Sequence, residues 1–504
     1  MNVHCSSRTL LLLTFSLTGL STRVYPQDKP TILTNATILD GTGTPARRGN
    51  IRFQNGRIIA VGNISPMPGD SIIDARGLTL APGFIDNHSH HDEGADREPI
   101  VLGAVSQGIT TIVIGQDGSS RLPLSSAFAE YEANPLAVNI ASYSGHNSIR
   151  DSVMGKDFRR AATPSEIEMM RRLLGEDLRA GALGLSTGLE YDPGIFSAKD
   201  EVLTLAKTTA EMGGRYISHV RSEDRWFWQA IDELLAIGRE TGMPVQVSHM
   251  KLAMKSLWGE GDSLIRVLDQ ARAAGIKVTA DVYPYTYWMA TLQVLFPERN
   301  FTDSAEAEFV LANVSPADGL LLGQFDPDTM LVGRTVAEIA RQRGRSEAGT
   351  LMGLIAESME SGESVIGTSM IEPDIERIIT WPWASISSDG GLHSLHPRGF
   401  GAFPRVLGRY VRERRVISLS EAIRKMTSLA ADNVGIVDRG RLAVGMAADL
   451  VLFDPARVLD RSTTKDPFAT AQGIEGVWVN GTMVYHDGKV TGARPGRVLR
   501  RVPR

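Results

Sequence analysis

Two histidines separated by one residue, His88 and His90, are well placed in this sequence to bind a metal ion. They end the run Ala-Pro-Gly-Phe-Ile-Asp-Asn-His, which begins at Ala81 and has the apolar character of a buried strand. Alternate side chains of a strand point to the same face, so the two imidazoles would point together, with His91 on the opposite face. Paired imidazoles of this kind are typical of divalent-metal sites.

Two further histidines, His219 and His249, close short apolar runs within Ile-Ser-His-Val-Arg and Val-Ser-His-Met-Lys. Taken alone, each could be a structural histidine of the core. The chain has ten histidines, however, and four of them stand at three such run ends. We therefore interpret both as metal ligands that join the first pair.

Carboxylate side chains also stand at the ends of short apolar runs, as these histidines do. Asp389, in Ser-Ser-Asp-Gly, can contact a metal and accept a proton from a metal-bound water, which makes it the candidate general base. Asp117, in Gly-Gln-Asp-Gly, is a further predicted ligand, although an Asp-Gly turn is the alternative for both. Glu190 is a weaker candidate as ligand or bridge. The single cysteine, Cys5, lies in the N-terminal segment, so nitrogen and oxygen ligands are expected.

The elements that must hold these residues alternate between strand and helix. Short apolar runs that end in polar residues cover 83–88, 110–117, 137–141, 182–186, 215–219, 244–249, 277–281 and 384–389. Eight strand–helix units predict an α/β fold, a (β/α)8 TIM barrel over residues 80–435, with its active site at the C-terminal strand ends. Residues 295–361 are too long for a plain crossover and predict an insertion.

Both ends of the chain are rich in short strands. Asn55-Gly56 and Asn480-Gly481 are hairpin signals between apolar runs. We therefore expect a small β-sandwich domain built from residues 28–79 and 436–504. No chemistry is expected from this domain, which serves as scaffold.

The N-terminal apolar run, residues 9–20, follows Arg8 and is too short to span a membrane. We interpret residues 1–27 as a secretory signal peptide and expect an exported protein, periplasmic or secreted, with no membrane span once the peptide is removed. The 53 basic and 58 acidic residues give a net charge of −5 without a basic block, which argues against a nucleic-acid partner. The oligomeric state is left open.

Together these motifs resemble the amidohydrolase superfamily and, within it, the N-acyl-D-amino-acid deacylase (D-aminoacylase) family. The resemblance rests on 82–90, Gly-Leu-Ser-Thr-Gly-Leu-Glu-Tyr (184–191), Ser-His-Met-Lys (248–251), Asp-Val-Tyr-Pro-Tyr (281–285) and His-Pro-Arg-Gly-Phe (396–400). It implies a zinc-dependent hydrolase that removes the acyl group from small N-acyl-D-amino acids, with one or two zinc ions or another divalent metal. It also implies that Lys251 and Tyr283 bind the substrate carboxylate.

The chain departs from that resemblance at one position. Asp117 stands where characterised D-aminoacylases carry a zinc-binding cysteine, and a carboxylate is a harder ligand than a thiolate. Two alternatives stay open. One is a dipeptidase or other amidase on the same scaffold, because substrate choice lies in the loops. The other is a non-catalytic exported binding protein, against which the intact histidines and Asp389 argue.

Overall fold

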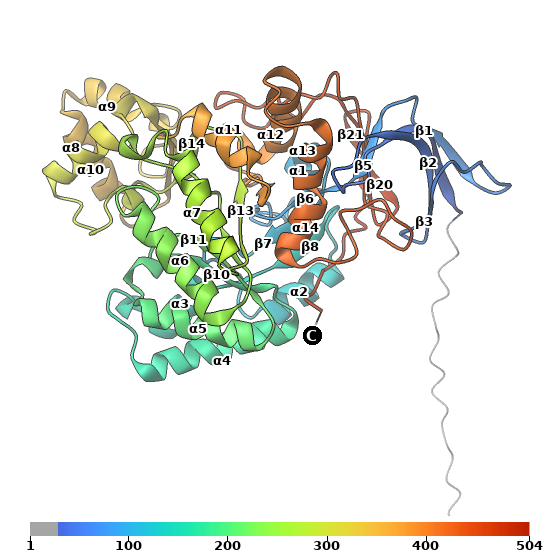
Figure 1. Ribbon diagram of the computed structural model, residues 1–504. Helices are drawn as coiled ribbons and strands as arrows, with labels where there is room; N and C mark the ends of the chain where they lie inside the picture. Colours follow the sequence, from blue (N-terminus) through green and yellow to red (C-terminus); the bar gives the residue numbers. More distant parts are fainter. Residues whose placement is uncertain (1–28, 503–504) are drawn as a thin grey trace, which may run out of the picture.

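The computed structural model describes residues 29–502 and confirms the predicted (β/α)8 barrel (Figure 1). Parallel pairing links the barrel strands in chain order. They are β6 (Phe84–Asp86), β7 (Ile109–Ile114), β8 (Asn139–Ser142) with β9 (Ser144–Gly145), β10 (Gly184–Gly188), β11 (Arg215–His219), β12 (Val245–Val247), β13 (Val278–Val282) and β17 (Ala384–Ile386). The barrel closes where Asp389 N–H donates to the His88 carbonyl at 2.9 Å.

Helices cover the outside of the barrel (Figure 1). Helix α4 (Pro164–Ala180) shows why they form where they do: Thr163 and Glu166 make a capping box, Pro164 occupies the first turn, and Gly181 ends the helix with φ 111°. The others are α1 (Leu102–Val105), α2 (Leu124–Ala133), α3 (His146–Met154), α5 (Lys199–Glu211), α6 (Phe227–Thr241), α7 (Gly261–Ala273), α11 (Glu372–Thr380), α12 (Arg398–Arg405), α13 (Leu419–Met426) and α14 (Ser428–Val434).

The insertion between β13 and β17 is longer than the sequence indicated, since it runs from 287 to 368 instead of 295 to 361. Its three-stranded antiparallel sheet has the order β14-β16-β15, and the short helix η4 (Leu292–Leu295) follows β14. The helices of the insertion lie on the opposite side of the barrel from the β-rich domain (Figure 1). The elements are β14 (Tyr287–Ala290), α8 (Ser304–Asn313), β15 (Leu320–Phe325), α9 (Val336–Arg343), α10 (Glu347–Ser358) and β16 (Glu363–Thr368).

The β-rich domain joins both ends of the chain, as predicted, but it is one mixed nine-stranded sheet rather than two stacked sheets. The two halves meet where β5 pairs with β18, and Leu80 lies opposite Leu452. The sheet curls so that β3 approaches residues 446–448, which encloses a separate apolar core. Its strands are β1 (Thr31–Ile38), β2 (Arg47–Gln54), β3 (Arg57–Gly62), β4 (Ser71–Asp74), β5 (Thr79–Pro82), β18 (Leu450–Phe453), β19 (Ile474–Val479), β20 (Thr482–His486) and β21 (Lys489–Val490).

The last residues of the described chain leave this domain and return to the barrel. Gly496 N–H donates to the Leu136 carbonyl at 2.9 Å, and Leu499 N–H donates to the Ile140 carbonyl at 2.7 Å. The tail therefore packs beside β8. The predicted signal peptide, residues 1–27, lies outside the described residues. Within residues 29–502, no helix combines the length and the apolar character needed to cross a membrane.

Candidate metal centre and active site

Four of the predicted site residues meet at the C-terminal mouth of the barrel, where β6, β7 and β17 end. The Nε2 atom of His90 lies 3.3 Å from Asp117 Oδ2 and 3.3 Å from Asp389 Oδ1. His88 Nε2 lies 3.3 Å from Asp117 Oδ2 and 3.5 Å from Asp389 Oδ1. These donor atoms all lie within 4.8 Å of one another, a spacing that suits a single divalent ion.

Asp117 also belongs to a second set of donors, with His219 and His249. Its Oδ1 atom lies 3.3 Å from His249 Nε2, and His219 Nδ1 lies 3.0 Å from the same nitrogen. Asp117 thus turns one carboxylate oxygen toward each set. If two metal ions were bound, Asp117 could contact both of them.

The backbone at three of these residues aims the side chains into the barrel mouth. Asp117, His249 and Asp389 have φ values of 52°, 32° and 50°, in the left-handed region that residues other than glycine seldom adopt. Strained backbone of this kind is concentrated at functional sites. The Asp-Gly turn considered from the sequence is present at Asp117, whereas Asp389 and Gly390 do not form a turn. Both carboxylates nevertheless face histidines.

Two glutamates hold the outer nitrogens of the second set. Glu190 Oε2 lies 2.9 Å from His219 Nε2, and Glu223 Oε1 lies 3.0 Å from His249 Nδ1. Carboxylates behind imidazoles fix the ring orientation and the tautomer of metal-binding histidines. Glu190 therefore lies behind a ligand and away from Asp117, in a third cluster with His219 and Glu223. Sequence reasoning missed Glu223, although it stands four residues after His219.

Asp281, at the end of β13, is fully buried between the histidines and the last strand. Its Oδ1 accepts hydrogen bonds from His249 N–H at 2.9 Å and from the Ser387 hydroxyl at 2.8 Å, and lies 3.4 Å from His88 Nδ1. It therefore positions one histidine of each set. The sequence analysis assigned it no role.

The electrostatics of the cluster favour a cation. Burial works against charge on His88, but Asp117, Asp281 and Asp389 outweigh it and raise the His88 pKa to about 10. Burial likewise opposes charge on Asp117, yet His88 and His249 hold the pKa of this carboxyl well below its usual value. Asp117 Oδ1 is buried, and no described residue donates a hydrogen bond to it. The oxygen and nitrogen donors present therefore fit a divalent metal ion.

Asp389 is paired with Arg398 at the first turn of α12. Arg398 Nη1 lies 2.6 Å from Asp389 Oδ2, whereas Asp389 Oδ1 faces His88 and His90. Burial raises the Asp389 pKa, but Arg398 and the histidines outweigh it and lower the pKa below its usual value. The carboxylate is thus ionised at neutral pH and held in one orientation. Arg398 lies in the His-Pro-Arg-Gly-Phe motif, to which the sequence analysis gave no chemical role.

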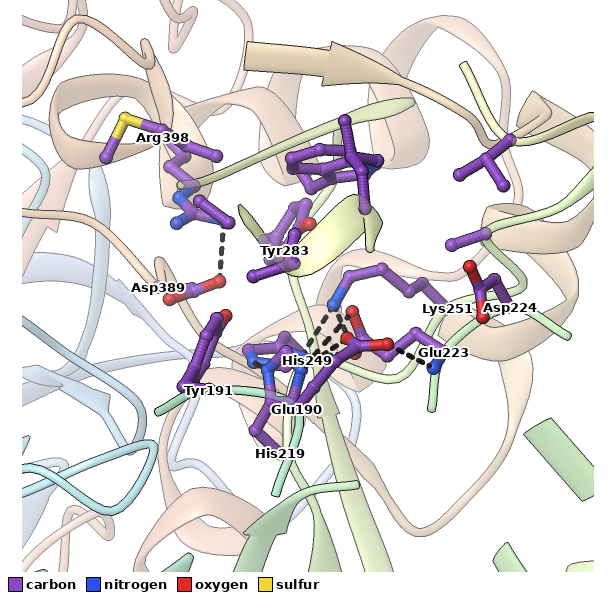
Figure 2. Close-up of a pocket in the computed structure, with 17 residues that line it drawn as sticks. Glu190, Tyr191, His219, Glu223, Asp224, His249, Lys251, Tyr283, Asp389 and Arg398 are labelled. Atoms are coloured by element: carbon purple, nitrogen blue, oxygen red, sulfur yellow. Dashed lines mark hydrogen bonds and ion pairs between the residues drawn. The ribbon is translucent and has the colours of Figure 1, made fainter. Parts of the chain in front are cut away.

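A cavity with an empty volume of about 460 Å³ adjoins the metal-ligand clusters (Figure 2). In it, the Tyr283 hydroxyl and the Nε of Arg398 are buried, and neither forms a hydrogen bond with any residue of 29–502. The guanidinium carbon of Arg398 lies 4.8 Å from the centre of the Tyr283 ring. Lys251 Nζ contacts Glu223 Oε1 at 2.6 Å and His249 Nδ1 at 2.7 Å. The cavity therefore offers unpaired donors for an anion such as a carboxylate.

The sequence profile of the amidohydrolase family matches residues 71–388 and 324–485. The chain belongs to the amidohydrolase family. Among curated amidohydrolases, an N-acyl-D-aspartate deacylase of Alcaligenes xylosoxydans xylosoxydans is 38% identical over 94% of this chain and 95% of its own length. A D-aminoacylase of the same organism is 36% identical over 93% of this chain and 97% of its own length. These relatives place the chain among the N-acyl-D-amino-acid deacylases, which confirms the resemblance found in the motifs.

Solved structures of related amidohydrolases have the same fold as this chain. A crystal structure of D-aminoacylase superposes with a TM-score of 0.85 at 35% identity, covering 94% of this chain and all of the other. An N-acyl-D-glutamate deacylase from Bordetella bronchiseptica also superposes with a TM-score of 0.85, at 34% identity over 94% of this chain and 99% of that chain. That structure contains zinc and a phosphonate inhibitor that mimics the tetrahedral intermediate of the reaction. A further study of D-aminoacylase describes a binuclear metal centre in that enzyme.

Proposed function

We propose that this chain is a metal-dependent hydrolase that removes the acyl group from N-acyl-D-amino acids. The observation that carries the proposal is the position of Asp117, which lies between two sets of donors beside a cavity with an unpaired Tyr283 hydroxyl. The names of the related deacylases support the same substrate class.

Zinc is the metal we propose, in one or two positions. It is supported by the zinc in the related glutamate deacylase and by a donor set of imidazoles and carboxylates. A D-aminoacylase variant has been solved with copper chloride, so another divalent ion is a candidate as well. When bound, the ion would acidify a water molecule and polarise the amide carbonyl of the substrate.

The chain's own residues supply the rest of the chemistry. Asp389 accepts the proton of the attacking water on the oxygen that faces His88 and His90, and it then gives a proton to the departing amine nitrogen. Arg398 holds the other oxygen of Asp389, so the acceptor is oriented before the substrate arrives. Tyr283 and Lys251, with the free Nε of Arg398, bind the substrate carboxylate and keep the amide at the metal centre.

A chiral substrate screen tests the proposal. Purified protein loaded with zinc is assayed with N-acetyl-D-amino acids, their L-enantiomers and dipeptides, and release of the amine is measured. We expect turnover of the N-acetyl-D-amino acids. Preference for dipeptides would favour the dipeptidase alternative, and binding without turnover would favour a non-catalytic protein.

We also propose that the protein is exported, on the strength of the apolar run at residues 9–20 after Arg8. Fractionation of cells that express the full chain, together with sequencing of the mature N-terminus, tests this. Intact Met1 in the cytoplasmic fraction would contradict it.

A further inference from the structure

His396 is a fully buried histidine that stands two residues before Arg398. It opens the His-Pro-Arg-Gly-Phe motif, and it is not among the described residues that line the active-site cavity. Its Nδ1 lies 3.1 Å from the backbone nitrogen of Arg398, and its Nε2 lies 2.9 Å from the Tyr287 carbonyl oxygen. The ring therefore contacts both the helix that carries Arg398 and the first residue of the insertion.

The two partners of His396 require a neutral ring with one defined tautomer. A backbone N–H can only donate and a carbonyl can only accept, so Nδ1 accepts from Arg398 N–H and Nε2–H donates to the Tyr287 carbonyl. Burial and the positive charge of Arg398 hold the pKa of His396 well below its usual value, although the Tyr287 carbonyl and Asp389 act in the opposite direction. The neutral imidazole therefore serves both partners at once.

The backbone on the other side of Arg398 is fixed as well. The Gly399 carbonyl oxygen lies 2.8 Å from His91 Nε2 and accepts a hydrogen bond from Gln107 Nε2 at 2.9 Å. With its backbone held on both sides, Arg398 presents its guanidinium to Asp389 from a fixed origin, and the two side chains meet at 2.6 Å (Figure 2). The orientation of the Asp389 carboxylate thus depends on where this backbone is held.

The two sides of Arg398 are anchored to different parts of the fold. Both donors to the Gly399 carbonyl lie between β6 and β7 of the barrel. Tyr287 instead begins β14, where it pairs with Thr368 of β16 in the sheet of the insertion. His396 is therefore a hydrogen-bonded link between the insertion sheet and Arg398, and a displacement of β14 would act on Arg398 through this ring.

We propose that His396 is a positioning residue for the reaction, which transmits the placement of β14 to Arg398 and so orients the carboxylate of Asp389. The general base is then fully aligned only when β14 of the insertion is in place. Small misplacements of a reacting group reduce rates strongly, so a buried residue that touches no substrate can still control turnover. This inference rests on the proposed function.

A double-mutant cycle with the zinc-loaded full chain tests this role. His396→Gln replaces the ring by a flexible amide that cannot hold both partners in the same geometry, so kcat for N-acetyl-D-methionine or N-acetyl-D-glutamate should fall by about 10-fold or more. Because His396 acts through Arg398, the same substitution in an Arg398→Ala background should change kcat by less than about 2-fold. Zinc content, measured alongside the melting temperature, should stay at the wild-type value because His396 is not a ligand.

The matched control is His486→Gln, which makes the same change at an exposed histidine of β20 and should leave kcat unchanged in both backgrounds. If His396→Gln does not fold, His396→Asn enters the same cycle. Its shorter amide can still accept from Arg398 N–H but no longer reaches Tyr287, and we expect the same dependence on Arg398. An unchanged kcat in the folded variant, or an equal loss in both backgrounds, would overturn the positioning role. Wild-type protein that hydrolyses neither substrate would instead refute the proposed function, and this inference with it.

Discussion

Replacing Asp117 tests whether one carboxylate serves two metal positions. Asp117→Ala would reduce one donor set from four residues to three and the other from three to two. Loss of residues that merely support a ligand already costs about 10–100-fold in metal affinity, so loss of a shared ligand should exceed about 100-fold, or roughly 2.7 kcal/mol. The variant should therefore retain less metal per chain after dialysis than the wild type.

A second variant separates the ligand from the turn. Asn tolerates the left-handed backbone that Asp117 adopts at φ 52° but carries no charge, so Asp117→Asn keeps the turn and weakens the site. If Asp117 were only a turn residue, Asp117→Ala would lose about 1 kcal/mol of unfolding free energy, and Asp117→Asn would resemble the wild type.

The assay is metal content by plasma mass spectrometry, with circular dichroism to confirm the fold. Asp96→Ala, an exposed acidic residue in the loop after β6, is the matched control and should keep its metal. Wild-type stoichiometry in a folded Asp117→Ala would refute the bridging role. The remaining centre would then be a site held by the histidines with Asp389.

Further outcomes follow from the same geometry. Asp389→Asn should keep its fold and metal while kcat falls by about 100-fold or more, because an amide accepts no proton at neutral pH; near wild-type turnover would exclude Asp389 as the base. Tyr283→Phe should raise KM several-fold for N-acyl-D-amino acids but leave KM unchanged for their carboxamides, since the hydroxyl forms no hydrogen bond within the described part of the chain; equal effects on both substrates would contradict carboxylate binding. Chelation should abolish turnover, and zinc, cobalt or manganese should restore it, because the centre has no sulfur ligand that favours zinc. Burial raises the pKa of Glu363 to about 7, so its folded form holds a proton that the unfolded chain loses near pH 4.5, and stability falls as pH rises between these values. Glu363→Gln should therefore gain in melting temperature relative to the wild type at pH 8 more than at pH 5, and an equal difference at both pH values would count against this.

The barrel and most of the polar strand ends could be predicted because both follow from short-range patterns. Apolar runs that end in His or Asp are visible without any tertiary information, and parallel strands must bring such ends together. His219 and His249 were recognised in this way, thirty residues apart on neighbouring strands.

The missed residues share a different property. Glu223 and Arg398 lie beyond the strands, on the loop after β11 and at the start of α12, where no periodicity indicates which way a side chain points. Their roles arise from contacts with His249 and Asp389 that only the folded chain creates. The sequence analysis also placed the start of the insertion too late. Strand β14 begins only a few residues after β13 ends, so the sequence shows no clear boundary between the last residues of the barrel strand and the insertion.

The pairing of β5 with β18, together with the tail beside β8, affects how the chain is made. A growing polypeptide presents residues 31–82 first, yet the strand that completes their sheet begins at Leu450. Until β18 is made, the backbone N–H and C=O groups on this edge of β5 are unpaired. An unpaired edge can pair with another strand or be cleaved by a protease. The backbone of Ile140 is completed even later in synthesis, because its hydrogen-bond partners are the Arg497 carbonyl and the Leu499 N–H. A chain that ended before Leu450 would carry every candidate metal ligand but would leave the backbone groups of both β5 and Ile140 without these partners.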